Sequence, residues 1–145
     1  MTNDNQEAAA GADMIIFAVK PWLMEPVIKE LELKGTEILI SVAAGIPFEE
    51  LTHYVADKEM TMFRLIPNTA ISEMESMTLI ASRNATKEQE QLMLDIFNQM
   101  GLAMLIPEEK IAATTAMTSC GIAYVLKYIP VSYTHLRAHE TRRHL

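Results

Sequence analysis

Short apolar runs of strand length alternate with amphipathic stretches along most of the chain. Strands are predicted at residues 14–19, 38–42, 60–65, 77–81 and 103–106, and helices at residues 6–10, 26–33, 48–55, 86–100 and 108–128. The run at 14–19 is continuously apolar, which indicates burial on both faces and hence a parallel sheet. Strands that alternate with helices of about ten residues predict βαβ units with right-handed crossovers, that is, an α/β fold with a doubly wound parallel sheet.

Local signals mark several helix ends. Asp4 or Asn3 is expected to cap the first helix, because short polar side chains there accept hydrogen bonds from free backbone N–H groups. Thr86 and Gln89 have the spacing of a capping box. Gly101 follows the apolar stripe of the helix at 86–100 and is expected to stop it.

The chain lacks the glycine-rich turn through which dinucleotide-binding domains approach a pyrophosphate. It contains five glycines, and no spacing among them gives G-x-G-x-x-G. The residues leave two interpretations open. One is an α/β fold that binds no dinucleotide, and the other is the second half of a dinucleotide-binding fold whose first half carries the turn.

Composition narrows the classes of protein without choosing between these interpretations. The chain has 145 residues, 50% of them hydrophobic, a net charge of −7 and a pI near 5.0. An acidic chain of this kind argues against a surface for nucleic acid or anionic membrane. No apolar run approaches the roughly 18 residues of a spanning helix, no signal peptide is visible, and a single cysteine excludes an internal disulfide. We therefore expect a cytoplasmic protein.

The last residues differ sharply in composition from the rest. Residues 131–145 hold three of the four histidines, His135, His139 and His144, and their three arginines and one glutamate give a net charge of +2. The run VSYTHLRAHET resembles a translated sequencing-library adaptor, so residues 130–145 are expected to be a non-native tail. The alternative is a genuine basic tail. His139 and His144 are spaced one residue too far apart for a zincin motif, so no metal site is expected.

Four motifs carry a resemblance to a known family. They are ADMIIFAVKP at residues 12–21, ISVAAG at 40–45, FRLIPNT at 63–69 and SCGIAY at 119–124. In this order and spacing the chain resembles pyrroline-5-carboxylate reductases over residues 2–129. The VKP and RxxPNT elements are specific together, whereas either alone is weak. The resemblance implies an oxidoreductase of proline biosynthesis that reduces 1-pyrroline-5-carboxylate to L-proline, with NADP, or alternatively NAD, as cofactor.

The resemblance also implies a domain organisation. Residues 1–107 would be part of an NADP-binding Rossmann domain without its glycine-rich first half. Residues 108–129 would be the start of a helix that leads to a dimerisation domain. The chain would then be a fragment truncated at both ends and inactive by itself. The implied partners are a small-molecule substrate and, for full-length family members, further copies of the same protein, with neither nucleic acid nor membrane.

The resemblance places candidate site residues at the ends of three strands and near the starts of two helices. The expected cofactor-binding residues are Asn5, Ala18, Val19, Lys20, Pro21, Ala43, Ala44, Gly45 and Asn68. Asn68 and Ser119 are the expected substrate contacts. No catalytic acid or base and no metal ligand is expected, because the cofactor supplies the hydride and the protein mainly positions it.

Several of these residues have a structural alternative. Asn5 could equally cap the first helix, and Ala43–Gly45 could be a tight turn only. Lys20, at the end of a buried strand, favours a ligand role because its charge needs a partner. Arg64 is expected to brace an acidic residue rather than to bind the substrate carboxylate, since strand alternation places it at a different height from Asn68.

The last motif departs from the family pattern S-G-x-x-P-A-Y. Ile122 replaces the proline and Ser119 replaces a glycine, which puts the geometry of the substrate loop in doubt. Cys120 is expected to be a small buried hydrophobe without a nucleophilic role. Two other functions stay open: another Rossmann-type imine or hydroxyacid reductase, and a non-enzymatic flavodoxin-like binding domain. A glycine-rich strand encoded in frame upstream of Met1 would decide for the reductase.

Overall fold

The computed structural model describes residues 2–56 and 59–140, and side chains as far as Val131. The helices are α1 (Asn5–Ala9), α2 (Pro21–Glu30), α3 (Phe48–Tyr54), α4 (Lys87–Phe97), α5 (Ile111–Thr115) and α6 (Gly121–Glu140). The strands are β1 (Met14–Phe17), β2 (Ile38–Ser41), β3 (Met62–Ile66), β4 (Ser76–Arg83) and β5 (Gly101–Leu105). Three 3-10 turns, η1 (Thr69–Glu73), η2 (Asn98–Met100) and η3 (Glu108–Lys110), and a π-helical turn, η4 (Ala116–Cys120), complete the described elements.

The strands form one mixed sheet in the order β1-β2-β3-β4-β5. The pairs β1–β2, β2–β3 and β4–β5 are parallel, and β3–β4 is antiparallel. The sheet is therefore mostly parallel, as expected, but the prediction of a wholly parallel sheet is wrong at β3–β4. The connection between these strands, residues 67–75, contains only η1, whereas neighbouring parallel strands need a crossover of about a dozen residues or more.

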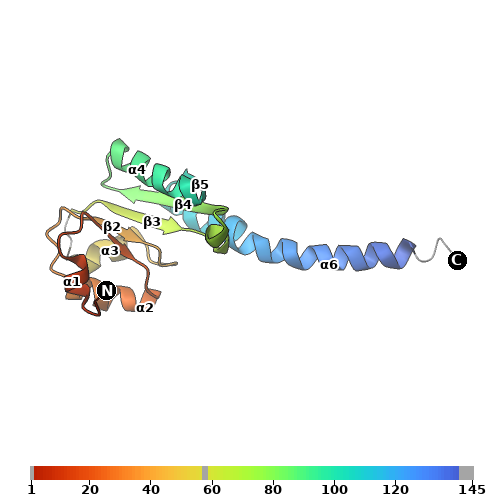
Figure 1. Cartoon of the computed structure of the whole chain (residues 1–145), viewed down its shortest axis with the longest axis horizontal. Helices are drawn as coiled ribbons and strands as arrows, with labels where there is room; N and C mark the ends of the chain where they lie inside the picture. The colour runs from red at the N-terminus through yellow and green to blue at the C-terminus, as the bar shows by residue number, and fades with distance from the viewer. Residues whose placement is uncertain (1, 57–58, 141–145) are drawn as a thin grey trace.

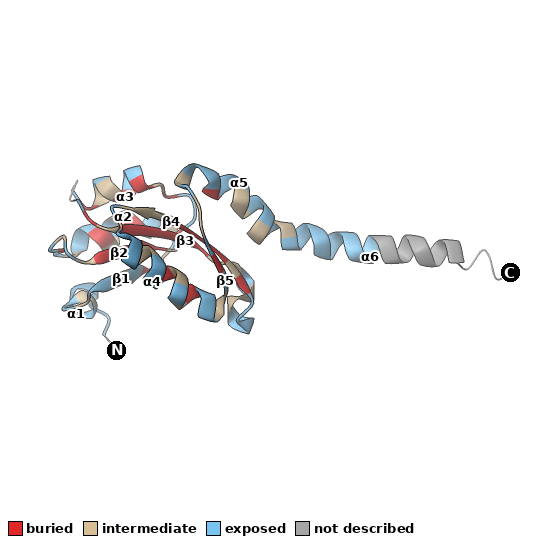
Figure 2. Cartoon of the chain, turned by 90° about the horizontal axis from the view of Figure 1, so that it is seen from above, coloured by how far each residue is buried: buried red, intermediate tan, exposed pale blue. Residues whose placement is uncertain are grey.

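Helices cover both faces of the sheet (Figure 1). Side chains alternate along β3: Met62 and Ile66 belong to the core shared with α2 and α3, while Phe63 and Leu65 belong to the core shared with α4. All the residues of β2 and β3 are buried, as Figure 2 shows for the centre of the sheet. Successive strand residues point to opposite faces, so a strand that is apolar throughout is buried on both.

Strand β1 is an exception to the predicted burial on both faces. Phe17 is buried in the core with α2, but Ile16 is 56% exposed and Met14 is 37% exposed. Ile16 lies beside Ile40 in the sheet, and Ile40 packs in the core under α4. Because β1 is the edge strand of the described sheet, the face that carries Ile16 extends beyond the cover of α4.

The predicted helix signals are largely confirmed. The Asp4 side chain caps α1 by accepting from the backbone N–H groups of Gln6 and Glu7, and Thr86 and Gln89 form both bonds of a capping box. The start predicted for the second helix, residue 26, is wrong. Helix α2 begins at Pro21, because a proline is favourable at the first helical position, where no N–H bond is lost.

The C-terminal helical segment is interrupted rather than uniform. The predicted helix at 108–128 consists of η3, α5, η4 and the first turns of α6, and α6 leads away from the sheet (Figure 1). Cys120 is exposed, so the expectation that it is buried is wrong. The backbone of α6 continues through Pro130 to Glu140, while the side chains of His135 and His139 and the whole of His144 lie outside the described residues. No helix in the described residues is long and apolar enough to cross a membrane.

Candidate functional site

The candidate site is the edge of the sheet at which β1, β2 and β3 end. These strands are parallel neighbours, so the segments that follow them, Val19–Pro21, Ala43–Gly45 and Pro67–Thr69, emerge at the same edge. The backbone N–H of Val42 donates to the carbonyl of Phe17 at 3.2 Å, which holds the first two strand ends together. Ligands of open α/β sheets bind outside the carboxyl ends of the strands. The structure thus brings three of the predicted motifs to one edge.

Lys20 presents an unpaired cation at this edge. It precedes α2, is exposed, and its carbonyl accepts from the N–H of Leu23 at 2.9 Å. Within the described residues its ammonium group has neither a hydrogen bond nor an ion pair. Trp22, the second residue of α2, is 74% exposed. A positive charge and a large aromatic surface are therefore both available beside the end of β1.

The turn after β2 leaves its backbone uncovered. Gly45 has a φ of +83°, in the left-handed region that favours glycine, and a Cβ there would meet nothing within 4 Å. Ala43 is buried and its N–H donates to the Ser41 hydroxyl at 3.3 Å, whereas Ala44 and Gly45 are exposed. A flat ligand could approach this backbone without meeting a side chain. The alternative of a tight turn is compatible with the same geometry.

Asn68 connects the end of β3 to the C-terminal helical segment. Its Oδ1 accepts from the N–H of Ala70 at 3.1 Å, and its Nδ2 donates to the carbonyl of Thr118 at 3.2 Å. The bond to Thr118 brings Ser119 to the strand-end edge. The Ser119 Oγ is buried without a hydrogen-bond partner in the described residues, and so is the Thr115 Oγ1 one turn earlier. Sequence reasoning did not single out Thr115, because nothing in a run of small residues marks one hydroxyl as buried.

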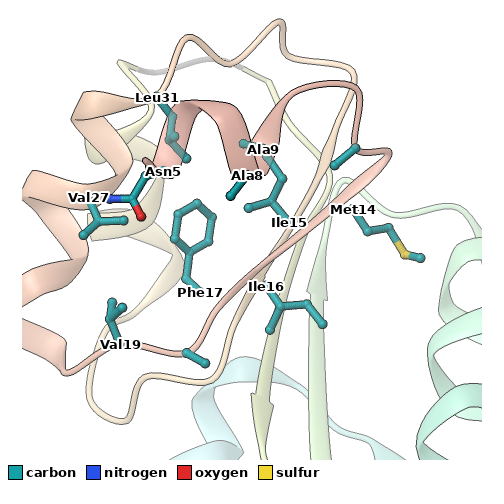
Figure 3. Close-up of a pocket in the computed structure, with 12 residues that line it drawn as sticks. Asn5, Ala8, Ala9, Met14, Ile15, Ile16, Phe17, Val19, Val27 and Leu31 are labelled. Atoms are coloured by element: carbon teal, nitrogen blue, oxygen red, sulfur yellow. The ribbon is translucent and has the colours of Figure 1, made fainter. Parts of the chain in front are cut away.

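Asn5, Ala18 and Val19 line a pocket of about 260 Å³ between α1, α2 and β1 (Figure 3). The rest of the lining is mainly apolar, with Phe17 at its centre in Figure 3. The Asn5 Nδ2 donates to Glu30 Oε2 at 3.0 Å and so links α1 to α2. The capping alternative for Asn5 is wrong, because Asp4 caps α1.

Arg64 is buried in an ion pair and lies level in the sheet with Ser41, the last residue of β2. Its Nη1 lies 2.7 Å from Glu108 Oε1, and the same oxygen accepts from the N–H of Phe48 at 2.7 Å. The guanidinium also lies over the Phe48 ring, 5.9 Å from its centroid. The expectation that Arg64 braces an acidic residue is confirmed. Its partner could not be identified from the sequence, since Glu108 is 44 residues away.

The carboxylates with a shifted pKa lie outside the strand-end edge. Burial raises the pKa of Glu37, but the backbone N–H groups around the carboxylate, among them those of Lys34 and Gly35, lower it by more, so the net pKa is lowered. In the part of the chain that the structure describes, no three His, Cys, Asp or Glu side chains could hold a metal ion. The chemistry at the edge is thus one of a cation, amide and hydroxyl groups, and open backbone.

Comparisons with known proteins find similarity to one family model at the start of the chain and to pyrroline-5-carboxylate reductases over most of it. Residues 1–45 match the family model described as NADP oxidoreductase coenzyme F420-dependent. A pyrroline-5-carboxylate reductase of Methanosarcina acetivorans is 33% identical over 89% of this chain and 48% of that protein. The solved structure of the reductase from Coxiella burnetii superposes with a TM-score of 0.82 at 26% identity, over 90% of this chain and 50% of that one.

A second solved structure extends the comparison to a liganded protein. The Plasmodium falciparum pyrroline carboxylate reductase, solved with NADP bound, has a TM-score of 0.81 and 29% identity over 90% of this chain and 50% of its own. The chain therefore spans about half the length of these relatives. The order of the sheet also differs from the 2-1-3-4-5 order of flavodoxin-like domains, which disfavours that alternative.

Proposed function

We propose that this chain, which is related to pyrroline-5-carboxylate reductases in sequence and fold, forms the nicotinamide-proximal part of such an enzyme. The observation that carries the proposal is the meeting of the VKP, AAG and PNT segments at one edge of the sheet. The proposed reaction is the reduction of 1-pyrroline-5-carboxylate to L-proline with NADPH, or alternatively NADH.

The described residues fit the nicotinamide half of the cofactor. The backbone at Ala44 and Gly45 is open to a flat ring, and the unpaired ammonium group of Lys20 is available to a ribose or phosphate oxygen. Asn5, Ala18, Val19, Pro21, Ala43 and Asn68 complete the proposed cofactor contacts. The pyrophosphate half would need a glycine-rich turn, which this sequence does not contain.

The residues of this chain position the reactants, and the cofactor, when bound, supplies the hydride. The Ser119 hydroxyl is the proposed hydrogen-bonding group for the substrate, and Asn68 contributes to substrate binding at the same edge through its bond to Thr118. No described side chain at this edge needs to act as an acid or base for this role. The proposed enzyme works in the cytoplasm as a homo-oligomer, with residues 1–107 in its cofactor domain, residues 108–129 starting the connecting helix, and residues 130–145 foreign to it.

The test is a chimera in which residues 2–129 replace the matching segment of the M. acetivorans reductase. We expect NADPH oxidation that depends on 1-pyrroline-5-carboxylate. The 145-residue chain alone is expected to bind NADPH weakly or not at all in titration calorimetry. A folded chimera without reductase activity would contradict the proposed function, and micromolar binding by the chain alone would contradict the role assigned to the missing turn.

A further inference from the structure

We propose that Asn68 is a positioning residue, which fixes the π-helical turn η4 and with it the Ser119 hydroxyl at the strand-end edge. The proposal rests on the proposed function in one respect, the assignment of Ser119 as a substrate contact. The observations that carry it are the two hydrogen bonds of the Asn68 side chain and the unpartnered hydroxyls of η4 and the turn before it.

The Asn68 amide is engaged at both ends by protein groups. Its oxygen caps η1 through the N–H of Ala70, and its nitrogen donates to the Thr118 carbonyl, 50 residues further along the chain. In the described part of the chain, no other hydrogen bond joins residues 116–129 to the sheet or its loops. Asn68 therefore provides the directional contact between the end of β3 and the helical segment that leaves the sheet (Figure 1).

The turn that Asn68 contacts is itself unusual. Residues 116–120 form a π-helical turn between α5 and α6, and such turns are rare and concentrate at functional sites. Thr118 is the middle residue of this turn, and its carbonyl accepts from the Asn68 amide. The bond thus fixes the place of the turn beside the sheet.

The hydroxyls on this turn are available to a ligand. Thr115 and Ser119 are four residues apart and therefore share a face of the helix. Their oxygens are buried without a partner in the described residues, and a buried hydroxyl in that state costs stability unless something else bonds to it. Because Ser119 follows Thr118 directly, the Asn68 bond sets where the Ser119 hydroxyl lies. Loss of the bond should therefore weaken the hydrogen bond that Ser119 is proposed to make with the substrate.

Asn68→Asp isolates the proposed bond. Aspartate keeps the oxygen that caps η1 but cannot donate to the Thr118 carbonyl. By hydrogen–deuterium exchange on the 145-residue chain, we expect amides 118–122 to exchange at least about tenfold faster in Asn68→Asp, while amides 70–75 stay protected. Asn98→Ala is the control, since it removes the bond that the Asn98 side chain accepts from the N–H of Ala103, between η2 and β5. Unchanged exchange in Asn68→Asp, or amides 118–122 unprotected in the unmodified chain, would overturn the proposal.

Kinetics on the chimera distinguish positioning from direct contact. If Asn68 acts on the substrate through Ser119, the double variant Asn68→Asp/Ser119→Ala should lose no more kcat than Ser119→Ala alone. Independent contacts of Asn68 with the ligand would give multiplied losses, and that result would overturn the positioning role. An inactive chimera would count against the proposed function only, because the exchange experiment needs no activity.

Discussion

At the scale of single residues, the Arg64–Glu108 pair shows what strand alternation can and cannot predict. Alternation indicated that Arg64 stands apart from the strand end, and the structure pairs it with an acid. The identity of that acid depends on how the chain returns over the sheet after β5. Glu108 also receives the first free N–H of α3, that of Phe48, so one carboxylate joins three segments distant in the sequence. Such a contact leaves no local pattern to find.

Removing the Glu108 carboxylate should destabilise the fold. Glu108→Ala leaves the Arg64 charge buried and unpaired, and we expect a loss of about 3 kcal/mol in the free energy of unfolding, measured by urea titration. Glu109→Ala is the control, because Glu109 is exposed and has no partner in the described residues; a change within about 0.5 kcal/mol is expected. Equal effects of the two variants would contradict the bracing role.

The Glu37 carboxylate should make stability depend on pH. Its pKa is lowered in the folded chain, net of burial, by the surrounding N–H groups. A depressed folded-state pKa contributes stability that is complete above the ordinary glutamate pKa and is lost as the pH falls through the folded value. We expect Glu37→Gln to lower the urea midpoint at pH 7. At pH 3 the midpoint of the variant should approach that of the unmodified chain. Glu32→Gln, at an exposed carboxylate, is the control for the loss of a surface charge.

Substitutions of the proposed site residues should have different effects on kcat and KM in steady-state kinetics of the chimera. Asn68→Ala should lower kcat by about 10²-fold, because it releases the Ser119 hydroxyl, whose proposed hydrogen bond to the substrate strengthens in the transition state. Lys20→Ala should mainly raise the KM for NADPH, since contacts to the ribose bind ground and transition states alike. Arg64→Ala should lower kcat less than Asn68→Ala. A larger loss in Arg64→Ala would show that the pair with Glu108 serves catalysis directly.

At the scale of elements, the positions of the strands could be predicted and the direction of one could not. Apolar runs located all five strands, because burial of the sheet demands them. The antiparallel direction of β4 follows from the short connection at residues 67–75, which is too short for a crossover between parallel neighbours. The π turn η4 had no signal in the sequence, since no local pattern marks the contact of Thr118 with Asn68, 50 residues earlier.

Gly101 is required by the approach of two strands rather than by the end of a helix alone. Its φ is +132°, and a Cβ there would lie 2.2 Å from the carbonyl oxygen of Ser76, its neighbour in β4. We expect Gly101→Ala to prevent cooperative folding in thermal denaturation. Gly35→Ala, at a φ of +91° with open space around it, should cost only the strain of the left-handed backbone, about 1–3 kcal/mol. Similar melting temperatures for the two variants would contradict the steric argument.

At the scale of the whole molecule, two apolar surfaces stand out among those left uncovered in the described part of the chain. One is the β1 face with Met14 and Ile16, and the other is the first half of α6, where Tyr124, Val125 and Leu126 are each more than half exposed (Figure 2). A helix that is apolar on all sides is normally buried, and an unpaired edge strand favours association. Folding of the 145-residue chain by itself should therefore be marginal.

These surfaces lead to a prediction about the isolated chain in solution. We expect it to self-associate at micromolar concentrations in size-exclusion chromatography with light scattering, and to melt broadly. Ile16→Lys should reduce association by placing a charge on the exposed β1 face, whereas Ile40→Lys, at the adjacent buried position, should abolish folding. The two variants distinguish an effect on association from an effect on folding. The two residues are neighbours in the sheet and differ only in what covers them. A monodisperse monomer with a sharp cooperative transition would show that the described surfaces are tolerated in water, and would remove the physical reason for a further covering segment.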